Sequence, residues 1–191
     1  MNIELLNNRW LSLQGNHSVI VFYGKGNKYS SFSNFARHKP FVFKIPCGLF
    51  KDQIVNISFA EKAIMLCKAS LMDDTKTFNS IMCSNNAGEC KRLGRMVSPW
   101  NQTLWDINVC SIAKYIIFNK FAQIDYLKKL LSETGDKIIA EASPRDTIWG
   151  IGLSSDNNNI NYPNLWKGSN ILGWALMEVR DELRDANLEM R

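Results

Sequence analysis

The chain has no long apolar stretch and no cysteine pattern of the kinds that define membrane spans, disulfide frameworks or zinc sites. No run approaches the roughly 18 apolar residues that a membrane span requires, and the first residues lack the basic-then-apolar order of a signal peptide. The five cysteines are widely spaced and form no C-x-x-C pair, which argues against both a disulfide framework and a zinc site. We therefore expect a cytoplasmic protein with reduced thiols and no membrane partner.

Histidine is also scarce, because His17 and His38 are the only two in the chain. Both precede the densest polar clusters, whereas a triad that depends on histidine would have to use one of them. Carboxylates and lysine are better candidates for any chemistry. We expect no metal and no cofactor.

The length and charge of the chain limit its organisation and its partners. The 191 residues, 46% hydrophobic and 21% charged, are enough for one well-buried domain with little room for two. Lys and Arg number 23 against 18 Asp and Glu, a net charge of +5, which favours anionic partners. Runs of Lys and Arg, expected of a dedicated nucleic-acid binder, are missing. We predict a single domain over residues 1–191 with its core over about residues 18–186.

The spacing of apolar residues predicts an α+β protein that is mostly helical and has a small β-sheet. We expect strands at residues 18–23, 41–45, 54–57 and 138–140, with the second and third forming a hairpin. We expect helices at residues 58–72, 87–96, 105–121, 125–132 and 170–186. The last helix has an apolar stripe opposed by charged residues, as an amphipathic surface helix does.

The segment over residues 141–152 is the most informative part of the chain. It follows a predicted buried strand and combines two carboxylates, an arginine, a tryptophan and a Gly-x-Gly in a loop broken by proline. Asp146 lies three residues before Trp149, so an acid/base group would stand beside a flat stacking surface. Loops on a rigid element are where binding and catalytic groups concentrate. The alternative is an ordinary exit from a strand, with Trp149 filling the core.

The predicted helix over residues 58–72 has two charged residues among apolar ones. Glu61 and Lys68 are seven residues apart and fall within about 20° of each other on one face, roughly 10 Å apart. Because Glu and Lys are almost never fully buried without partners, the pair indicates a lined cleft. Two other interpretations remain open. Ser58 and Glu61 match a capping box, and Lys68 can extend its amine to solvent.

Three further groups are candidates for substrate binding. Lys91 and Arg95 are four residues apart on the next predicted helix, where they would hold a phosphate or form a solvated basic face. Asn34 and Phe35 belong to a polar, aromatic-rich turn. Asn170 precedes the last helix, whose N-terminus can be capped by a side chain or can bind an anion.

Taken together, these positions resemble the NADAR superfamily, also called YbiA-like proteins. The resemblance covers roughly residues 20 to 185, and its specificity lies in the order and spacing of many short fragments. The fragments that carry it are Ser33-Asn34-Phe35, Phe59 with Glu61, Lys68-Ala69, Lys91 with Gly94-Arg95, Trp105, Lys120-Phe121, Glu141-Ala142-Ser143-Pro144 with Asp146, Trp149-Gly150, Gly152, Gly168, Asn170, Leu172-Gly173, Met177, Val179-Arg180 and Leu183.

The resemblance implies a compact, helix-rich α+β domain and an N-glycosidase that acts on a ribose joined to a base. The implied activities include removal of ADP-ribose from modified guanine and cleavage of phosphoribosyl intermediates of riboflavin synthesis. It makes Glu61, Lys68 and Asp146 the leading catalytic candidates and Trp149 the leading stacking residue. The implied partner is a phosphorylated ribosyl or ADP-ribosyl substrate, which can be part of a nucleic acid.

Two routes suit these residues. In the first, Asp146 or Glu61 activates water while the other carboxylate stabilises the cationic sugar. In the second, Lys68 attacks C1′ and forms a Schiff base that water then resolves. A different class of protein is also possible, namely a non-catalytic ADP-ribose or nucleotide reader. Such a reader has no need of Glu61, Lys68 and Asp146 together.

Overall fold

The computed structural model describes residues 1–189 and consists of two compact units. The first unit joins residues 1–33 to residues 125–189, and the second is Asn34–Ile124. The elements of the first unit are α1 (Ile3–Ser12), β1 (Val19–Phe22), the 3₁₀ helix η1 (Ser30–Phe32), α6 (Asp125–Ser132), β4 (Ile138–Glu141), the 3₁₀ helix η2 (Pro163–Leu165) and α7 (Ile171–Glu189). Those of the second are β2 (Phe41–Lys44), β3 (Ile54–Ile57), α2 (Ala60–Leu71), α3 (Thr75–Cys83), α4 (Ala87–Gly94) and α5 (Gln102–Gln123).

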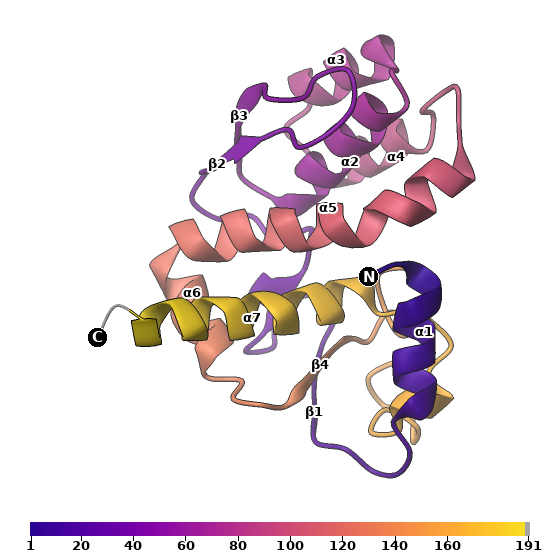
Figure 1. Ribbon diagram of the computed structural model, residues 1–191, viewed down its shortest axis with the longest axis vertical. Coiled ribbons are helices and arrows are strands. Elements are labelled where there is room, and N and C mark those ends of the chain that lie inside the picture. Colours follow the sequence, from indigo (N-terminus) through magenta and orange to yellow (C-terminus); the bar gives the residue numbers. More distant parts are fainter. Residues whose placement is uncertain (190–191) are drawn as a thin grey trace. The chain divides into compact units, whose positions relative to one another are not determined.

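A parallel pair of strands forms the centre of the first unit. β1 and β4 pair in register from Val19 opposite Ile138, and α7 packs against β4 (Figure 1). Gly173 makes this close packing possible, because a Cβ at that position would collide with the carbonyl oxygen of Ile139. The helix α6 packs on α7, and α1 packs on η2.

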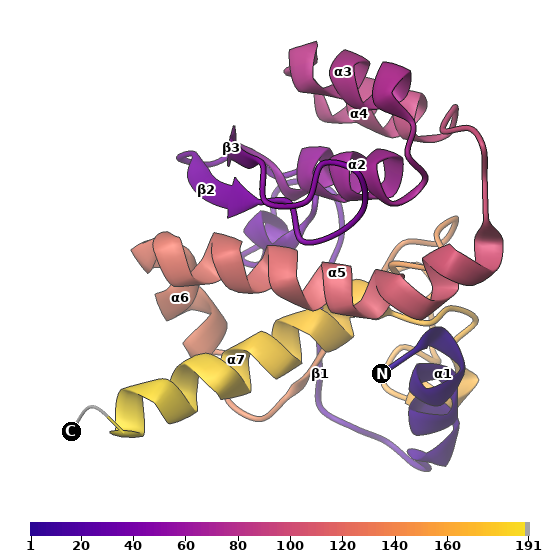
Figure 2. The same ribbon diagram turned by 45° about the horizontal axis from the view of Figure 1, so that its top comes forward.

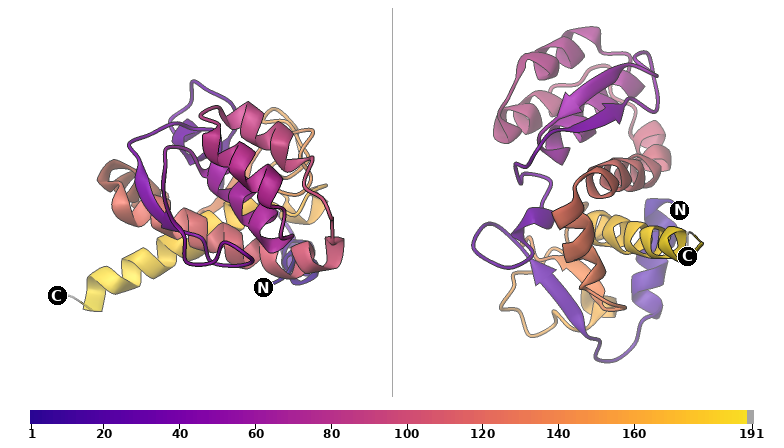
Figure 3. Two further views of the ribbon diagram at one scale, coloured as in Figure 1. Left: turned by 90° about the horizontal axis from the view of Figure 1, so that it is seen from above. Right: turned by 90° about the vertical axis from the view of Figure 1, so that its left-hand side faces the viewer.

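The helix α2 is the centre of the second unit. It contacts α3, α4 and α5, and α3 and α4 lie together beside it in Figure 2. The antiparallel hairpin of β2 and β3, visible in the right-hand view of Figure 3, contacts α5 and α2. Gly94 lets α4 approach α2, because a Cβ there would collide with the side chain of Met65. A helix packed on this many sides explains why α2 is apolar nearly all round.

Most predicted elements are confirmed, and so is the predominantly helical α+β class. The strand at residues 18–23 and the hairpin at residues 41–57 are observed, as are the five predicted helices with shifts of a few residues at their ends. The prediction of one small sheet needs a correction, because the four strands form two separate pairs. The organisation as a single domain stays a prediction.

The sequence analysis missed two helices, α1 and α3. Each begins with a side-chain cap, in which Asn2 accepts from the Leu5 amide and Asp74 accepts from the Thr77 amide. Each buries few apolar side chains, since α1 buries only Leu6 and Trp10 and α3 buries Phe78 and Ile81. Both helices are therefore defined by capping and by a few tertiary contacts instead of a long apolar stripe.

Among residues 1–189, no helix is both long enough and apolar enough to span a bilayer. All five cysteines are free thiols. The cytoplasmic location stays a prediction.

Candidate active site

The N-terminal end of α2 buries Glu61. This carboxylate side chain is only 4% exposed. The helix is capped at Phe59 without a side-chain hydrogen bond, so Ser58 is not its N-cap residue and the capping-box interpretation is wrong. The Glu61 amide instead donates to the carbonyl oxygen of Asn34 at 2.9 Å. Glu61 thus lies beside a predicted substrate-binding residue.

Lys68 lies two turns further along α2 and is half-buried against aromatic rings. Its Nζ lies 4.3 Å from the centroid of the Trp100 ring and 6.0 Å from that of Trp105. Burial lowers the pKa of Lys68, the positive charge of Arg95 lowers it further, and the negative charge of Glu61 opposes both. Desolvation favours the neutral amine, which is the nucleophilic form of lysine. The amine therefore rests on an indole face and is partly withdrawn from solvent.

The two tryptophans around Lys68 form a fixed aromatic wall. Their ring centroids are 6.0 Å apart, and Trp100 is 41% exposed whereas Trp105 is 6% exposed. Trp100 Nε1 donates to Gln102 Oε1, and Gln102 Nε2 donates to Asp106 Oδ1, which orients the outer ring. The sequence analysis did not include either tryptophan among the site residues. Their close spacing in the chain was the signal that could have found them.

The helix α4 brings two cations to α2. Lys91 Nζ lies 5.4 Å from the centroid of the Phe35 ring, and Arg95, the C-cap residue of α4, is close enough to lower the pKa of Lys68. Gly94 allows α4 to pack closely on α2, because a Cβ at position 94 would collide with the side chain of Met65. Lys91 is therefore associated with Phe35, near the start of α2, and Arg95 with Lys68, near its end.

Asn34 carries a buried polar atom without a partner. Its side chain is 5% exposed, yet Oδ1 accepts no hydrogen bond from the part of the chain that the structure describes. An unpaired buried acceptor costs roughly 1–3 kcal/mol, a cost that a ligand donor can remove. The neighbouring Phe35 is 44% exposed. These features fit the predicted role of both residues in substrate binding.

The loop after β4 uses Asp146 to hold its own shape. Asp146 Oδ1 accepts from the amides of Ile148 at 3.1 Å and of Trp149 at 2.8 Å. In turn, the amides at the start of α7 donate to this loop, from Ile171 to the Ile148 carbonyl and from Leu172 to the Trp149 carbonyl. The loop therefore occupies the N-terminus of α7, which leaves those two amides unavailable as an anion site.

Asn170 is bound to β4. It is fully buried and has a φ of 51°, in the left-handed region. Its Oδ1 accepts from the Glu141 amide at 3.1 Å, and its Nδ2 donates to the Ile139 carbonyl at 2.9 Å. A direct substrate contact by Asn170 stays a prediction. The geometry supports a role in which Asn170 fixes the strand from which the loop emerges.

The predicted site residues divide between the two units. Six of them belong to the second unit, where the contacts described above bring them together around α2. The six are Asn34, Phe35, Glu61, Lys68, Lys91 and Arg95. Asp146, Trp149 and Asn170 belong to the first unit, and their action on the same substrate stays a prediction.

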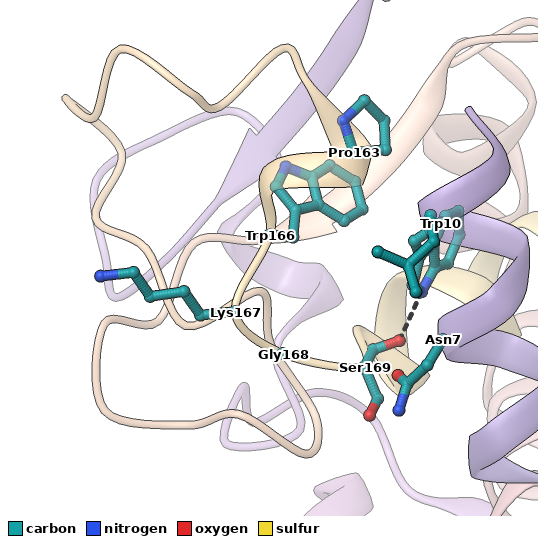
Figure 4. A pocket seen from close by; sticks show the side chains of 8 residues that line it. Asn7, Trp10, Pro163, Trp166, Lys167, Gly168 and Ser169 are labelled. Atoms are coloured by element: carbon teal, nitrogen blue, oxygen red, sulfur yellow. Dashed lines mark hydrogen bonds between the residues drawn. The ribbon is translucent and has the colours of Figure 1, made fainter. Parts of the chain in front are cut away.

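The first unit also contains an aromatic cavity that the sequence analysis did not find. It is lined by residues of α1 and by the segment at residues 163–169 (Figure 4). It includes none of the predicted site residues. Separately, no group of three or more His, Cys, Asp or Glu side chains within residues 1–189 is placed to hold a metal ion.

Similar proteins place this α+β fold in a known class. The NMR structure of the E. coli protein YbiA matches with a TM-score of 0.68 and 24% identity, covering 93% of this chain and 92% of that one. An N-glycosidase of Acanthamoeba polyphaga mimivirus is 37% identical over 164 residues, 85% of this chain and 95% of that protein. A riboflavin biosynthesis protein of Vibrio vulnificus is 32% identical over 119 residues, 62% of this chain and 29% of that protein.

The fold is thus YbiA-like, as the resemblance implied. The model of the NADAR domain matches residues 21–184. The chain belongs to the NADAR domain family. Since the match runs through parts of both units, the family segment includes every predicted site residue.

Proposed function

We propose that this NADAR domain protein, a hydrolase acting on N-glycosyl bonds, cleaves the C1′–N bond between a phosphorylated ribose and a base. Its family and its mimiviral N-glycosidase relative support the reaction class. The observation that carries the proposal is Lys68, whose amine is half-buried against Trp100 on a largely apolar helix and whose pKa is lowered. A lysine in such a place is suited to attack carbon.

The chemistry that we propose proceeds through Lys68. The lone pair of its neutral amine forms a bond to C1′ as the C1′–N bond breaks, and the base leaves with a proton. The amine nitrogen then loses one proton, and its second proton moves to the ring oxygen O4′ as the C1′–O4′ bond breaks, which gives an open-chain sugar with an imine between Nζ and C1′. Water adds to the imine and releases the free sugar together with the regenerated amine. The proton lost by the amine balances the proton gained by the base.

Other residues of the second unit have supporting roles in this scheme. The sugar acquires positive charge as the bond breaks, and the buried carboxylate of Glu61 would stabilise that charge. Lys91 and Arg95 would hold the phosphate or pyrophosphate, for which Arg has a bidentate geometry. Asn34 Oδ1, unpaired in the free protein, would accept a hydrogen bond from the substrate, and Phe35 would pack on it.

Asp146 and Trp149 remain part of the proposal. Trp149 would stack on the leaving base, a contact worth about 1–3 kcal/mol per base. In the alternative route, Asp146 or Glu61 activates water and Lys68 serves only as a charge. The bonds from Asp146 to the loop amides support a role in shaping the loop. The lowered pKa of Lys68 favours the amine route.

The finer proposal is that the substrate is ADP-ribose attached to guanine, in a nucleotide or in nucleic acid. It is supported by the two cations of α4, which match a pyrophosphate better than a single phosphate. A second candidate is a phosphoribosyl intermediate of riboflavin synthesis, supported by the name of the Vibrio vulnificus relative. A non-catalytic nucleotide reader would use the cations but has no need of a desolvated amine.

The decisive experiment compares substrates and then traps the intermediate. The protein is incubated with ADP-ribosylated guanosine, with a phosphoribosylamino-pyrimidine and with NAD, and free base is measured in each. Release from the first supports the finer proposal, release from the second alone supports the riboflavin alternative, and tight binding without release supports a reader. Release from NAD alone would contradict both substrate proposals.

Borohydride reduction during turnover should then attach the sugar to Lys68. Lys62 is the internal control, because it lies on the same helix and burial also lowers its pKa, but its amine is bound to the carbonyls of Met82 and Ser84. An adduct on Lys62 as abundant as on Lys68 would indicate nonspecific labelling. Turnover in Lys68→Ala, with no adduct in the native protein, would eliminate the Schiff-base route.

A further inference from the structure

The cavity of the first unit has the size of a site for one ring system. Its volume is about 210 Å³, and it is lined by Asn7, Trp10, Leu11, Pro163, Trp166, Lys167, Gly168 and Ser169. Pockets that enclose whole drug-sized ligands occupy roughly 300–1,000 Å³. This cavity is smaller and open to solvent, so a ring would enter it while the rest of the molecule stays outside.

Its aromatic walls are rigid before any ligand binds. Trp10 Nε1 donates to the Ser169 carbonyl at 2.7 Å, and Trp166 Nε1 donates to the Ile160 carbonyl at 3.0 Å. The two ring centroids are 5.3 Å apart. With both indole N–H groups bound to the backbone, the two rings are held in fixed orientations. Trp10 is buried, so Trp166, which is partly exposed, supplies the accessible ring face. A flat ring that stacks here would not have to reorganise the wall, which favours binding.

The polar groups of the cavity lie together on one side. Figure 4 shows the side chains of Asn7 and Ser169 next to each other, whereas Lys167 extends away from Trp10. A carboxamide both donates and accepts hydrogen bonds, and a hydroxyl does the same. No charged group points in from the lining shown in Figure 4. This combination fits a neutral ring with donors and acceptors along one edge and disfavours a phosphate or a carboxylate.

The wall from α1 lies outside the segment that defines the family. The family match begins at residue 21, while Asn7, Trp10 and Leu11 belong to α1. The opposite wall is fixed by a different contact, because a Cβ at Gly168 would collide with the carbonyl oxygen of Gly150. A helix that lies outside the family segment therefore completes a cavity on a wall that the family segment supplies.

From these features we propose that the cavity between α1 and residues 163–169 binds a neutral, flat heteroaromatic ring, such as the base of a nucleoside. The ring stacks on Trp166 and bonds through its polar edge to Asn7 and Ser169. This cavity contains none of the residues proposed for hydrolysis. A ring can bind in the cavity without any reaction at Lys68.

Adenosine is the probe for this proposal, with the indole N–H signals of ¹⁵N-tryptophan-labelled protein as the readout. The six tryptophans are assigned by single Trp→Phe substitutions. Adenosine should shift the signals of Trp10 and Trp166 saturably, while ribose 5-phosphate should leave them in place. The absence of a saturable shift at millimolar adenosine would overturn the proposal. A shift caused by a short proline-rich peptide but not by adenosine would overturn it in favour of a peptide site.

Two exposed leucines of α1 give a matched pair of variants. Leu11 lines the cavity and is 57% exposed, whereas Leu5 does not line it and is 56% exposed. Leu11→Arg should weaken adenosine binding by at least about tenfold, because it replaces an apolar wall of the cavity with a longer, charged side chain, and Leu5→Arg should not. Equal affinities in the two variants would overturn the proposal.

Asn7→Ala, which alters an exposed polar residue, is the second variant if Leu11→Arg does not fold, and it too should weaken binding. Unchanged affinity in Asn7→Ala would then overturn the proposal. Because the readout is binding, retained turnover in a Lys68 variant with the adenosine shifts intact would refute only the hydrolytic scheme.

Discussion

The surroundings of α2 and the loop after β4 use similar residues in opposite ways. Around the loop, the side chains of Asp146 and Asn170 are bound to backbone atoms, and the loop carbonyls accept from the first amides of α7. Around α2, Asn34 Oδ1 is buried without a donor, and Lys68 is held against indole rings with its pKa lowered.

We propose that the difference separates residues that mainly maintain the structure from residues that act on the substrate. A satisfied polar network rigidifies the chain, which describes the contacts of Asp146 and Asn170. Unpaired or desolvated polar groups cost folding free energy and are typical of functional sites, which describes Asn34 and Lys68. We therefore expect substitutions in the first region to alter stability and substitutions in the second to alter turnover.

The largest effect is expected from Lys68→Met. Loss of a nucleophile should reduce turnover by more than about a thousandfold, while the free energy of unfolding stays unchanged or rises because an amine is no longer desolvated. Base release is measured alongside urea denaturation. If Lys68→Met unfolds more easily and retains turnover, Lys68 maintains the structure and is not required for the reaction.

Asn170→Ala should act on stability. The substitution leaves the Glu141 amide and the Ile139 carbonyl without their partner, which should cost on the order of 2–5 kcal/mol, measured by urea denaturation. Asn170→Asp keeps the acceptor for Glu141 but buries a carboxylate against the Ile139 carbonyl oxygen, so it should cost at least as much. Unchanged stability combined with weakened substrate binding would instead make Asn170 a direct substrate contact.

Arg95→Ala should raise KM for phosphorylated substrates by about tenfold or more, since it removes a charge-assisted hydrogen bond worth roughly 1.5–3 kcal/mol. Unphosphorylated nucleosides should be affected much less. Arg92→Ala is the matched control, because Arg92 is an exposed arginine of the same helix that pairs with Glu89. Similar losses in the two variants, or for the two kinds of substrate, would make Arg95 part of a solvated basic face.

The smallest effect concerns pH. If the neutral amine of Lys68 is the reactive form, kcat/KM should rise with pH through the pKa of Lys68, which is below its usual 10.5. Glu61→Gln removes a negative charge that favours the ammonium, so the pKa falls and the rise should move to lower pH. Arg95→Gln removes a positive charge, so the rise should move to higher pH. If neither substitution moves the rise in kcat/KM along the pH axis, the rise reports the titration of a group other than Lys68.

Sequence patterns were sufficient for the elements that have long apolar stripes and for the residues that lie on them. The positions of Glu61 and Lys68 on one helix follow from their spacing, and α2 is apolar nearly all round as expected. The capping role of Ser58 was wrong because the chain enters α2 at Phe59. The capping-box motif involves only neighbouring residues, so it does not predict the hydrogen bond that the Glu61 amide donates to the Asn34 carbonyl oxygen.

The remaining features depend on contacts between residues far apart in the chain. The indole wall of Lys68 comes from residues more than thirty positions away. Whether Asn34 Oδ1 has a hydrogen-bond donor depends on all the residues that surround it in the folded chain. The structural role of Asn170 depends on the pairing of α7 with β4. The cavity between α1 and residues 163–169 joins opposite ends of the chain, so neither wall indicates it alone.

The contact between Gly94 and Met65 gives this protein a means of adjusting substrate preference without altering its reactive amine. A shorter side chain at position 65 would make room for a methyl group at position 94, and a paired exchange of this kind would change the spacing of the two helices by a small step. Both cations of α4 would move together relative to Lys68. Under the proposed function, selection or engineering for substrates of different phosphate length can therefore act through two buried residues.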